Sequence, residues 1–184
     1  MQILLHICCG PCLIYPFSRL NDQGFKIKGF YYNPNIYPAQ EYRSRKESLE
    51  VLSNDLQLEL KIPDLCECDF DQAIQNKENT PQRCVICWSL RLRKTALEAK
   101  DSNIPFFSTT LLVSPYQNHL VIKQLGEKIG QEVGVNFYYE DFRAGFRQAY
   151  AQAKEKKLYL QKYCGCKYSE MEQCKKLKIK KLLD

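Results

Sequence analysis

Segments with the pattern of buried strands alternate with segments of helical pattern along most of this chain. This alternation limits the fold more than any other feature. Short apolar runs indicate strands, and apolar residues that recur at helical spacing indicate helices. The order predicts a parallel sheet with helices on both faces. The expected strands are 3–7, 26–32, 58–62, 105–110 and 135–139, and the expected helices are 12–24, 39–54, 81–100 and 118–132.

The chain has 184 residues, a length that favours one domain with its own hydrophobic core. We predict an α/β fold, a three-layer Rossmann-like parallel sheet that occupies residues 1–145. Residues 146–184 become Lys-rich and are expected to form a helical C-terminal extension of the same domain. Within this extension, Cys164-Gly165-Cys166 is expected to form a loop between helices.

The positive charge of the chain lies near its end. The net charge is +6, and residues 151–184 hold ten lysines against four acidic side chains. Such a segment attracts phosphate backbones, although a solvated helix face has the same pattern. The start shows no signal-peptide pattern, and no apolar run approaches the ~20 residues that span a bilayer. We therefore expect a cytoplasmic protein without membrane contact.

Seven of the ten cysteines fall into three short motifs. The first motif is Cys8-Cys9-Gly10-Pro11-Cys12, the second is Cys84-Val85-Ile86-Cys87 and the third is Cys164-Gly165-Cys166. In the cytoplasm thiols stay reduced, so this abundance favours metal or redox chemistry over a disulfide framework. Thiolates gathered from distant segments suit an iron–sulfur cluster, zinc or thiol redox chemistry.

The first two motifs together can supply four thiolates to one centre. Cys84 and Cys87 have the spacing of a chelating pair. Adjacent residues of a strand point to opposite faces, so Cys8 and Cys9 reach one centre only if the backbone turns after them. Gly10-Pro11 provides that turn. Because adjacent cysteines are a poor hook for structural zinc, we prefer a cluster to zinc.

The other cysteines leave several interpretations open. Cys164 and Cys166 can form a labile disulfide, but they also fit ligands of a second metal or two inert buried thiols. Cys12 lies near a helix N-terminus, where the helix dipole would lower its pKa. It fits a metal ligand, a nucleophile or a packed thiol. The remaining three are interpreted as structural or incidental: Cys66, Cys68 and Cys174.

Polar and aromatic residues follow several expected strands, at the edge where parallel sheets bind ligands. Aromatic faces stack on bases, and cations bind phosphates. A core strand followed by a charged helix, and a surface ion pair between Asp141 and Arg143, would explain the same residues. The residues predicted to bind substrate or RNA are Tyr32, Asn33, Asn35, Arg43, Arg45, Lys46, Thr109, Thr110, Asp141 and Arg143.

Taken together, these motifs resemble the cobalamin-independent epoxyqueuosine reductase family, QueH. The resemblance runs in order through nearly the whole chain. It rests on the three cysteine motifs, on Tyr31-Tyr32-Asn33-Pro34-Asn35-Ile36 with Glu41-Tyr42 and Arg45, on Arg83 and Arg91-Leu92, on Thr109-Thr110-Leu111-Leu112 with Ser114-Pro115-Tyr116-Gln117, and on Asp141-Phe142-Arg143 and Tyr163.

The resemblance implies a fold similar to the HUP class of nucleotide-binding α/β units. It also implies reduction of the epoxide of epoxyqueuosine in tRNA to give queuosine, the last step of queuosine synthesis. A [4Fe-4S] cluster would be held by Cys8, Cys9, Cys84 and Cys87, and the redox-active disulfide would be Cys164–Cys166. An additional iron would have candidate ligands in Cys12, Cys164 and Cys166, which are also the expected catalytic residues. The implied partners are tRNA and an electron donor that the sequence does not identify.

The implied reaction consumes two electrons and two protons and releases water. A cluster passes one electron at a time, so a dithiol pair or an adjacent iron is a useful second store. One alternative is a tRNA thiolation or adenylation enzyme on a similar fold, but the segment after the first strand lacks the Ser-Gly-Gly run of a phosphate-binding loop. The other is a zinc-stabilised RNA-binding module, which metal content would distinguish.

Overall fold

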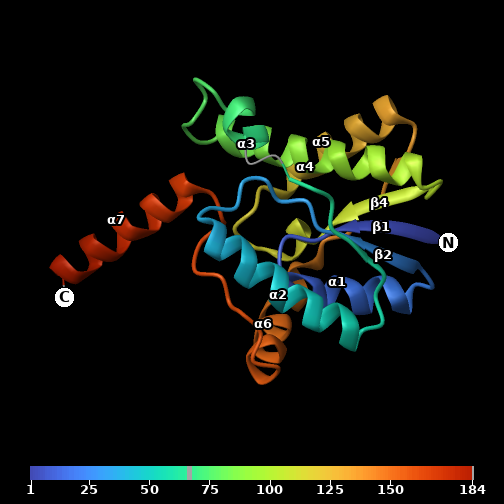
Figure 1. Cartoon of the computed structure of the whole chain (residues 1–184), viewed down its shortest axis with the longest axis horizontal. Helices are drawn as coiled ribbons and strands as arrows, with labels where there is room; N and C mark the ends of the chain where they lie inside the picture. Colours follow the sequence, from blue (N-terminus) through green and yellow to red (C-terminus); the bar gives the residue numbers. More distant parts are fainter. Residues whose placement is uncertain (66–67, 184) are drawn as a thin grey trace.

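A five-stranded, fully parallel sheet forms the centre of the computed structural model, which describes residues 1–65 and 68–183 (Figure 1). The strand order is β3-β2-β1-β4-β5, so the first strand lies in the middle. The strands are β1 (Gln2–His6), β2 (Lys26–Phe30), β3 (Leu60–Lys61), β4 (Phe106–Thr109) and β5 (Asn136–Phe137). Cys66, which the sequence suggested to be structural or incidental, lies outside the described residues.

The central strand is apolar because protein covers it on every side. Ile3, Leu4 and Leu5 are at most 2% exposed. In the parallel register, Ile3 pairs with Ile27 on one side and with Phe106 on the other. A strand with both faces buried has a continuous apolar run, which is the pattern of residues 3–7. The carboxyl end of β1 is therefore also buried, and the residues that follow it begin inside the protein.

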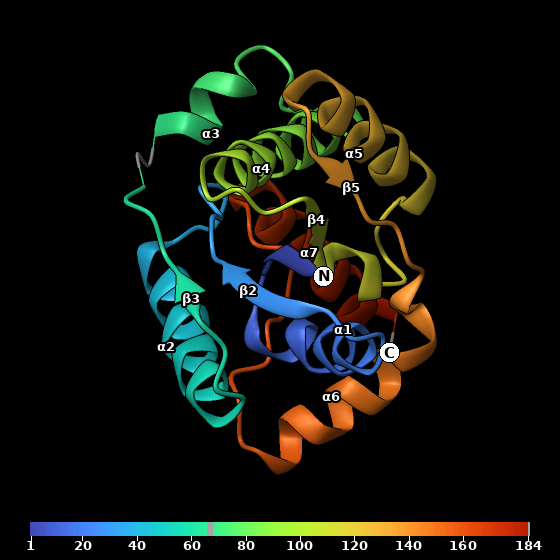
Figure 2. The ribbon, with the colours of Figure 1, turned by 90° about the vertical axis from the view of Figure 1, so that its right-hand side faces the viewer.

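Helices form a layer on each face of the sheet (Figures 1 and 2). One layer holds α1, α2 and α6, with α6 packed against α1, and the other holds α4, α5 and the short α3. The helices are α1 (Gly10–Asp22), α2 (Ala39–Asp55), α3 (Cys68–Ala73), α4 (Gln82–Asp101), α5 (His119–Val133), α6 (Phe146–Glu155) and α7 (Lys167–Leu183), and the 3-10 turns are η1 (Thr110–Val113) and η2 (Phe142–Gly145).

The last helix, α7, extends away from the sheet and its two helical layers (Figure 1). Its first residues contact the helical layer that holds α3, α4 and α5. Lys167 pairs with Asp71 of α3 at 2.9 Å, and Glu172 pairs with Arg83 of α4 at 2.8 Å. The lysines of the C-terminal segment are therefore carried on an arm that begins beside the second cysteine motif.

The predicted α/β fold is confirmed. All five expected strands and the four expected helices of the sheet core are present, although β3 and β5 pair over only two residues each. Helix α3 was not predicted, because six residues are too few to show a helical repeat. Among the described residues, no helix has the length and apolar character needed to cross a bilayer.

A thiol-lined pocket as the candidate active site

The first cysteine motif lies where β1 turns into α1. Cys9 has extended backbone angles and precedes the helix, and Gly10 and Pro11 form its first turn. Proline is tolerated there because the first helical N–H groups have no partner within the helix. The turn brings the Sγ atoms of Cys8, Cys9 and Cys12 within 4.8 Å of one another, and all three residues are buried. The expected change of backbone direction after Cys9 is thus confirmed.

Hydrogen bonds make Cys8 the most acidic thiol of this group. Interactions with Cys12 and Cys9, with help from Thr110, hold the pKa of Cys8 well below the usual value, and Cys8 Sγ lies 3.9 Å from Cys9 Sγ. The Thr110 hydroxyl donates to Cys8 Sγ at 3.3 Å and accepts from Cys8 N–H at 3.1 Å. The pKa of Cys12 is raised by Cys8, by Cys9 and by burial. The expectation that the helix dipole would lower the pKa of Cys12 is therefore wrong, because its proton is held by its neighbours.

The second motif lies on the first turns of α4, where Cys84 and Cys87 share one helix face. Cys87 is buried in a small cluster with Cys166, Phe70 and Ile74. Burial raises the pKa of Cys87 to about 12, and Cys164, Cys166 and Cys84 contribute in the same direction. The structure therefore brings the second motif next to the third.

The third motif is the loop before α7, and Arg45 fixes its backbone. The Arg45 guanidinium donates to the carbonyl oxygens of Cys164 and Tyr163, each at 3.1 Å, and its Nε donates to Glu41 at 2.7 Å. Arg45 is 1% exposed. A buried arginine paired with a carboxylate and two carbonyls is a rigid support, since each strong donor has a defined acceptor. Arg45 thus joins α2 to a loop more than 100 residues later.

Gly165 is required in this loop for two reasons. Its φ of +135° lies in a region that side-chain-bearing residues rarely adopt. A Cβ at this position would also lie 3.2 Å from both Arg45 Nη1 and Asn35 Nδ2. The close approach lets Gly165 accept a hydrogen bond from Tyr37 N–H at 2.8 Å. The glycine therefore places the two flanking cysteines against the wall made by residues 35–45.

Cys164 and Cys166 have different surroundings, although both are free thiols. Cys164 is exposed, and Gln117 Nε2 donates to its Sγ at 3.8 Å. Cys166 is buried and receives a hydrogen bond from Ser169 N–H at 3.4 Å. One thiol of the pair is thus open to an incoming partner while the other is shielded.

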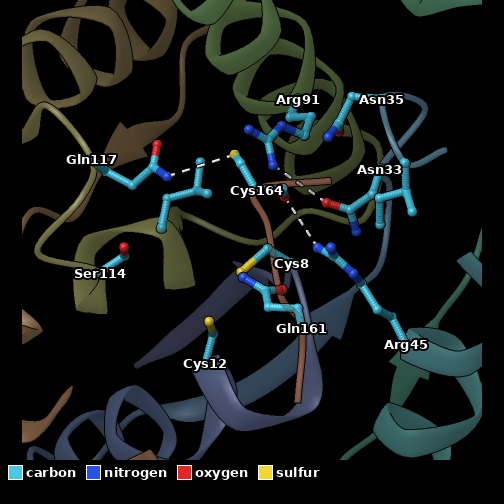
Figure 3. Close-up of a pocket in the computed structure, with 12 residues that line it drawn as sticks. Cys8, Cys12, Asn33, Asn35, Arg45, Arg91, Ser114, Gln117, Gln161 and Cys164 are labelled. Carbon is cyan, nitrogen blue, oxygen red and sulfur yellow. Dashed lines mark hydrogen bonds between the residues drawn. The ribbon is translucent and has the colours of Figure 1, made fainter. Parts of the chain in front are cut away.

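Cysteines of the first and third motifs line one pocket at the carboxyl ends of the strands (Figure 3). Ser114 and Gln117 close one side, and the arginines with the asparagines of the β2 loop close the other. The lining residues are Cys8, Cys12, Asn33, Asn35, Ile36, Arg45, Arg91, Leu111, Ser114, Gln117, Gln161 and Cys164. The pocket lies at the rim of the sheet where the first cysteine motif and the polar residues after the strands were expected to collect, but neither Cys84 nor Cys87 lines it.

Arg91 provides a buried donor that points into this pocket. Its Nε donates to Cys87 O at 3.2 Å and its Nη1 approaches Asn33 Oδ1 at 3.5 Å. Burial opposes the charge of Arg91, but Cys87, Cys164 and Cys8 raise its pKa, so it is a permanent cation. Its Nη2 has no hydrogen-bond partner among the described residues, and neither do Asn35 Oδ1 and Gln161 Oε1. Unpaired buried donors and acceptors indicate a site for a polar ligand.

Several residues predicted to bind substrate face elsewhere. Tyr32 donates its hydroxyl to Asp69 of α3 at 2.8 Å, and Thr109 bonds to the buried ring of His6 at 2.9 Å. Thr110 supports Cys8, as described above. The others are on the surface: Arg43 and Lys46 on α2, and Asp141 paired with Arg143 at η2. Of the ten predicted residues, Asn33, Asn35 and Arg45 line the pocket.

Sequence reasoning did not include Arg91, Ser114, Gln117 or Gln161 among the site residues. Cys84, Cys87 and Arg91 occur at helical spacing, so their shared face was a usable signal for Arg91. Gln161 has no such signal. It enters the pocket because residues 156–166 run back along α2, where Ser48 Oγ accepts from Tyr159 N–H at 3.0 Å.

The side chains at this rim are suited to a thiolate-bound metal centre. Three converging sulfur atoms are soft donors, and Cys8 has the low pKa that a metal ligand needs. Arg45 and Arg91 supply buried positive charge beside them. The donor set and its charge balance fit a thiolate-bound metal ion or cluster.

Comparisons with known proteins agree on one family. The family model described as "Epoxyqueuosine reductase QueH" matches residues 3–172. The QueH protein of Dehalococcoides mccartyi is 37% identical over 174 residues and 93% of each chain is covered. The QueH protein of Thermotoga maritima is 33% identical over 182 residues, covering 95% of this chain and 93% of that one.

Two solved structures share the fold at low identity. The U34-tRNA thiolase NcsA from Methanococcus maripaludis, solved with its [4Fe-4S] cluster, has a TM-score of 0.62 and 13% identity, covering 92% of this chain and 61% of that one. A predicted subunit of tRNA methyltransferase from Methanocaldococcus jannaschii has a TM-score of 0.56 and 14% identity, covering 84% and 75%. The likeness is one of fold and agrees with the α/β architecture described above.

Proposed function

This chain belongs to the epoxyqueuosine reductase QueH family, and we propose that it reduces epoxyqueuosine in tRNA to queuosine, the last step of queuosine synthesis. The observation that supports this most is a family match over residues 3–172, which includes every residue of the thiol-lined pocket. A cytoplasmic location is consistent with this role and stays a prediction.

The proposed reaction removes the epoxide oxygen as water and leaves an alkene, which requires two electrons and two protons. Oxidation of the Cys164 and Cys166 thiols to a disulfide releases two electrons and two protons, which balances one turnover. A reductant must then restore the dithiol, and this donor stays unidentified. The exposure of Cys164 supports the proposal, since one thiol of the pair is accessible to both substrate and reductant.

We propose that Cys8, Cys9, Cys84 and Cys87 hold a [4Fe-4S] cluster, with Cys12, Cys164 and Cys166 as candidate ligands of an additional iron. When bound, these centres would supply one-electron transfer and Lewis-acid polarisation of an oxygen. The convergence of Cys8 and Cys9 supports the first half of the cluster ligand set, and their closeness to Cys12 supports Cys12 as a ligand of the additional iron. The packing of Cys87 beside Cys166 supports a second motif that lies next to the third.

In this proposal the polar residues of the pocket orient the substrate. Arg91 Nη2 donates a hydrogen bond to the departing oxygen, because Arg91 is a buried cation whose Nη2 has no other partner among the described residues. Asn35 Oδ1 and Gln161 Oε1 accept from substrate hydroxyl or amine groups. Arg45 touches no substrate and instead keeps Cys164 in place through its carbonyl.

The test begins with anaerobic purification and measurement of iron, sulfide and zinc, followed by an assay on RNA that carries epoxyqueuosine. Iron and sulfide at about one cubane per chain, with conversion to queuosine, is the expected result. Stoichiometric zinc without sulfide, after reconstitution under anaerobic conditions has failed, would contradict the proposal and favour a zinc-stabilised RNA-binding module.

The redox role of the third motif has its own variants. Cys164→Ser and Cys166→Ser should retain the sulfide of the cluster but lose multiple turnover, because the single remaining thiol cannot form the disulfide that supplies two electrons and two protons. Cys174→Ser is the matched control, since Cys174 is an exposed cysteine on α7 outside the pocket. Multiple turnover by either Cys164→Ser or Cys166→Ser would refute the dithiol cycle.

A further inference from the structure

A row of three aromatic side chains lies beside the pocket and has no assigned role. Tyr116 packs edge-to-face on Phe146 with a centroid distance of 6.0 Å, and Phe146 lies 5.9 Å from Tyr150. Tyr116 is 84% exposed, the highest value among the large hydrophobic residues of the described chain. We call these three residues the aromatic row.

The row is continuous with the pocket through one short loop. Tyr116 lies between Ser114 and Gln117, which both line the pocket. Ser114 Oγ accepts from Tyr116 N–H at 3.3 Å, and Trp88 Nε1 donates to Gln117 Oε1 at 2.9 Å. The loop is thus held by hydrogen bonds on both sides of Tyr116, whose exposed ring is not part of the pocket lining.

Cations flank the aromatic row. On α6, Phe146, Tyr150 and Lys154 follow one another at four-residue spacing, and Arg147 lies three residues before Tyr150. These residues therefore share one side of the helix. Lys154 Nζ lies 5.8 Å from the Tyr150 ring centroid. Neither Arg147 nor Lys154 has a salt-bridge partner among the described residues, and both are exposed. An exposed aromatic beside unpaired cations is the combination that binds single-stranded RNA.

We propose that the aromatic row is a subsite for an unpaired nucleobase next to the nucleotide that enters the pocket. The base stacks on the exposed face of Tyr116, while Arg147 and Lys154 contact the adjoining phosphates. This inference rests on the proposed function, because it assigns the row to the same RNA substrate. Phe146 and Tyr150 keep the Tyr116 ring in its orientation and are positioning residues.

The test measures binding of an anticodon stem-loop RNA with 2-aminopurine beside the modified position, using the whole chain purified anaerobically. Stacking on Tyr116 should quench the fluorescence. Tyr116→Ala should abolish the quench and weaken binding about 5- to 100-fold, while Tyr116→Phe retains both. In turnover, Tyr116→Ala should raise KM and leave kcat unchanged. Val51→Ala, which removes an exposed apolar side chain from α2, is the control and should match wild type.

Salt dependence separates stacking from phosphate contact. Tyr116→Ala should leave the slope of log K against log salt unchanged, whereas the double variant Arg147→Gln/Lys154→Gln should reduce that slope by about 1.4. Wild-type affinity and quenching in Tyr116→Ala would overturn the subsite. If that variant also turned over more slowly at limiting reductant, the row would be a docking surface for a protein electron donor.

The outcome for the subsite is distinguishable from the outcome for the reaction. If wild type binds and quenches the RNA but converts no epoxyqueuosine, the proposed reduction fails and the base subsite stands. If wild type converts the RNA and Tyr116→Ala does so with the same KM, the reduction stands and the subsite fails.

Discussion

Arg91 has the most demanding environment of any residue in the pocket. A buried cation is costly unless its donors are satisfied, and Arg91 retains one donor without a partner. Its position between Cys87 O and Asn33 links the second cysteine motif to the loop after β2. We interpret the unpaired nitrogen as the group that substrate completes.

This interpretation predicts the effect of a conservative change. Arg91→Lys keeps the charge but has no planar fork, so it cannot contact Cys87 O, Asn33 and substrate together. We expect kcat to fall about 10- to 100-fold with iron and sulfide content unchanged. Arg93→Lys is the control, because Arg93 lies two residues after Arg91 on the same helix and forms an exposed ion pair with Glu132. Equal activity of the two variants would show that Arg91 is only structural.

At the scale of the element, the loop before α7 is defined by its attachment to α2. Arg45, Glu41 and Tyr159 connect the two segments, with the Tyr159 hydroxyl donating to Glu41 and the Glu41 carboxylate accepting from Arg45. The backbone of Gly165 then lies close to Arg45. The position of Cys164 in the pocket thus depends on the packing of α2.

Gly165 allows a test of this dependence. Gly165→Ala adds both backbone strain and a contact with Arg45, so we expect a loss of about 1–3 kcal/mol in unfolding free energy and a marked fall in turnover. Gly24→Ala is matched, because Gly24 also has a positive φ, of +80°, but no atom lies within 4 Å of its added Cβ. It should lose about 1 kcal/mol and keep its turnover. Urea unfolding and the turnover assay measure both, and full activity of Gly165→Ala would show that the loop can shift without harm.

At the scale of the whole molecule, charge and chemistry occupy the same end. The pocket lies at the carboxyl ends of the strands, and α7, whose sequence is Lys-rich, projects from that region (Figure 1). Exposed Arg43 and half-buried Lys46 of α2 add positive charge. We propose that these cations bind the tRNA backbone while the pocket receives the modified nucleotide.

The charge distribution predicts a position-dependent salt effect. Replacing Lys175 and Lys176 of α7 by Gln should reduce the slope of log affinity against log salt by about 1.4. Replacing Lys26 and Lys100 by Gln removes the same amount of charge from the other end of the sheet. Lys26 begins β2 and Lys100 lies in the last turn of α4, so this double variant should leave the slope unchanged. Equal slopes for the two double variants, measured by titration of tRNA at several salt concentrations, would remove α7 from the RNA interface.

The parts of this molecule that the sequence predicted are those specified locally. Strand β1, the turn after it and the pair on α4 follow from apolar runs, Gly-Pro and helical spacing. The contact of Arg45 with Cys164 O was not predictable, because it depends on a segment folding back along α2. Tyr32 shows the reverse error: its place beside the rim was correct, but its hydroxyl found Asp69 on a helix too short to predict.

The location of the three cysteine motifs along the chain also sets an order of assembly during translation. Cys8, Cys9 and Cys12 emerge from the ribosome more than 150 residues before Cys164 does. Because domains synthesised from the N-terminus acquire structure progressively, these soft ligands are present while the wall built by residues 161–166 is still missing. A nascent chain therefore passes through an interval in which its first three thiols are not yet covered by that wall.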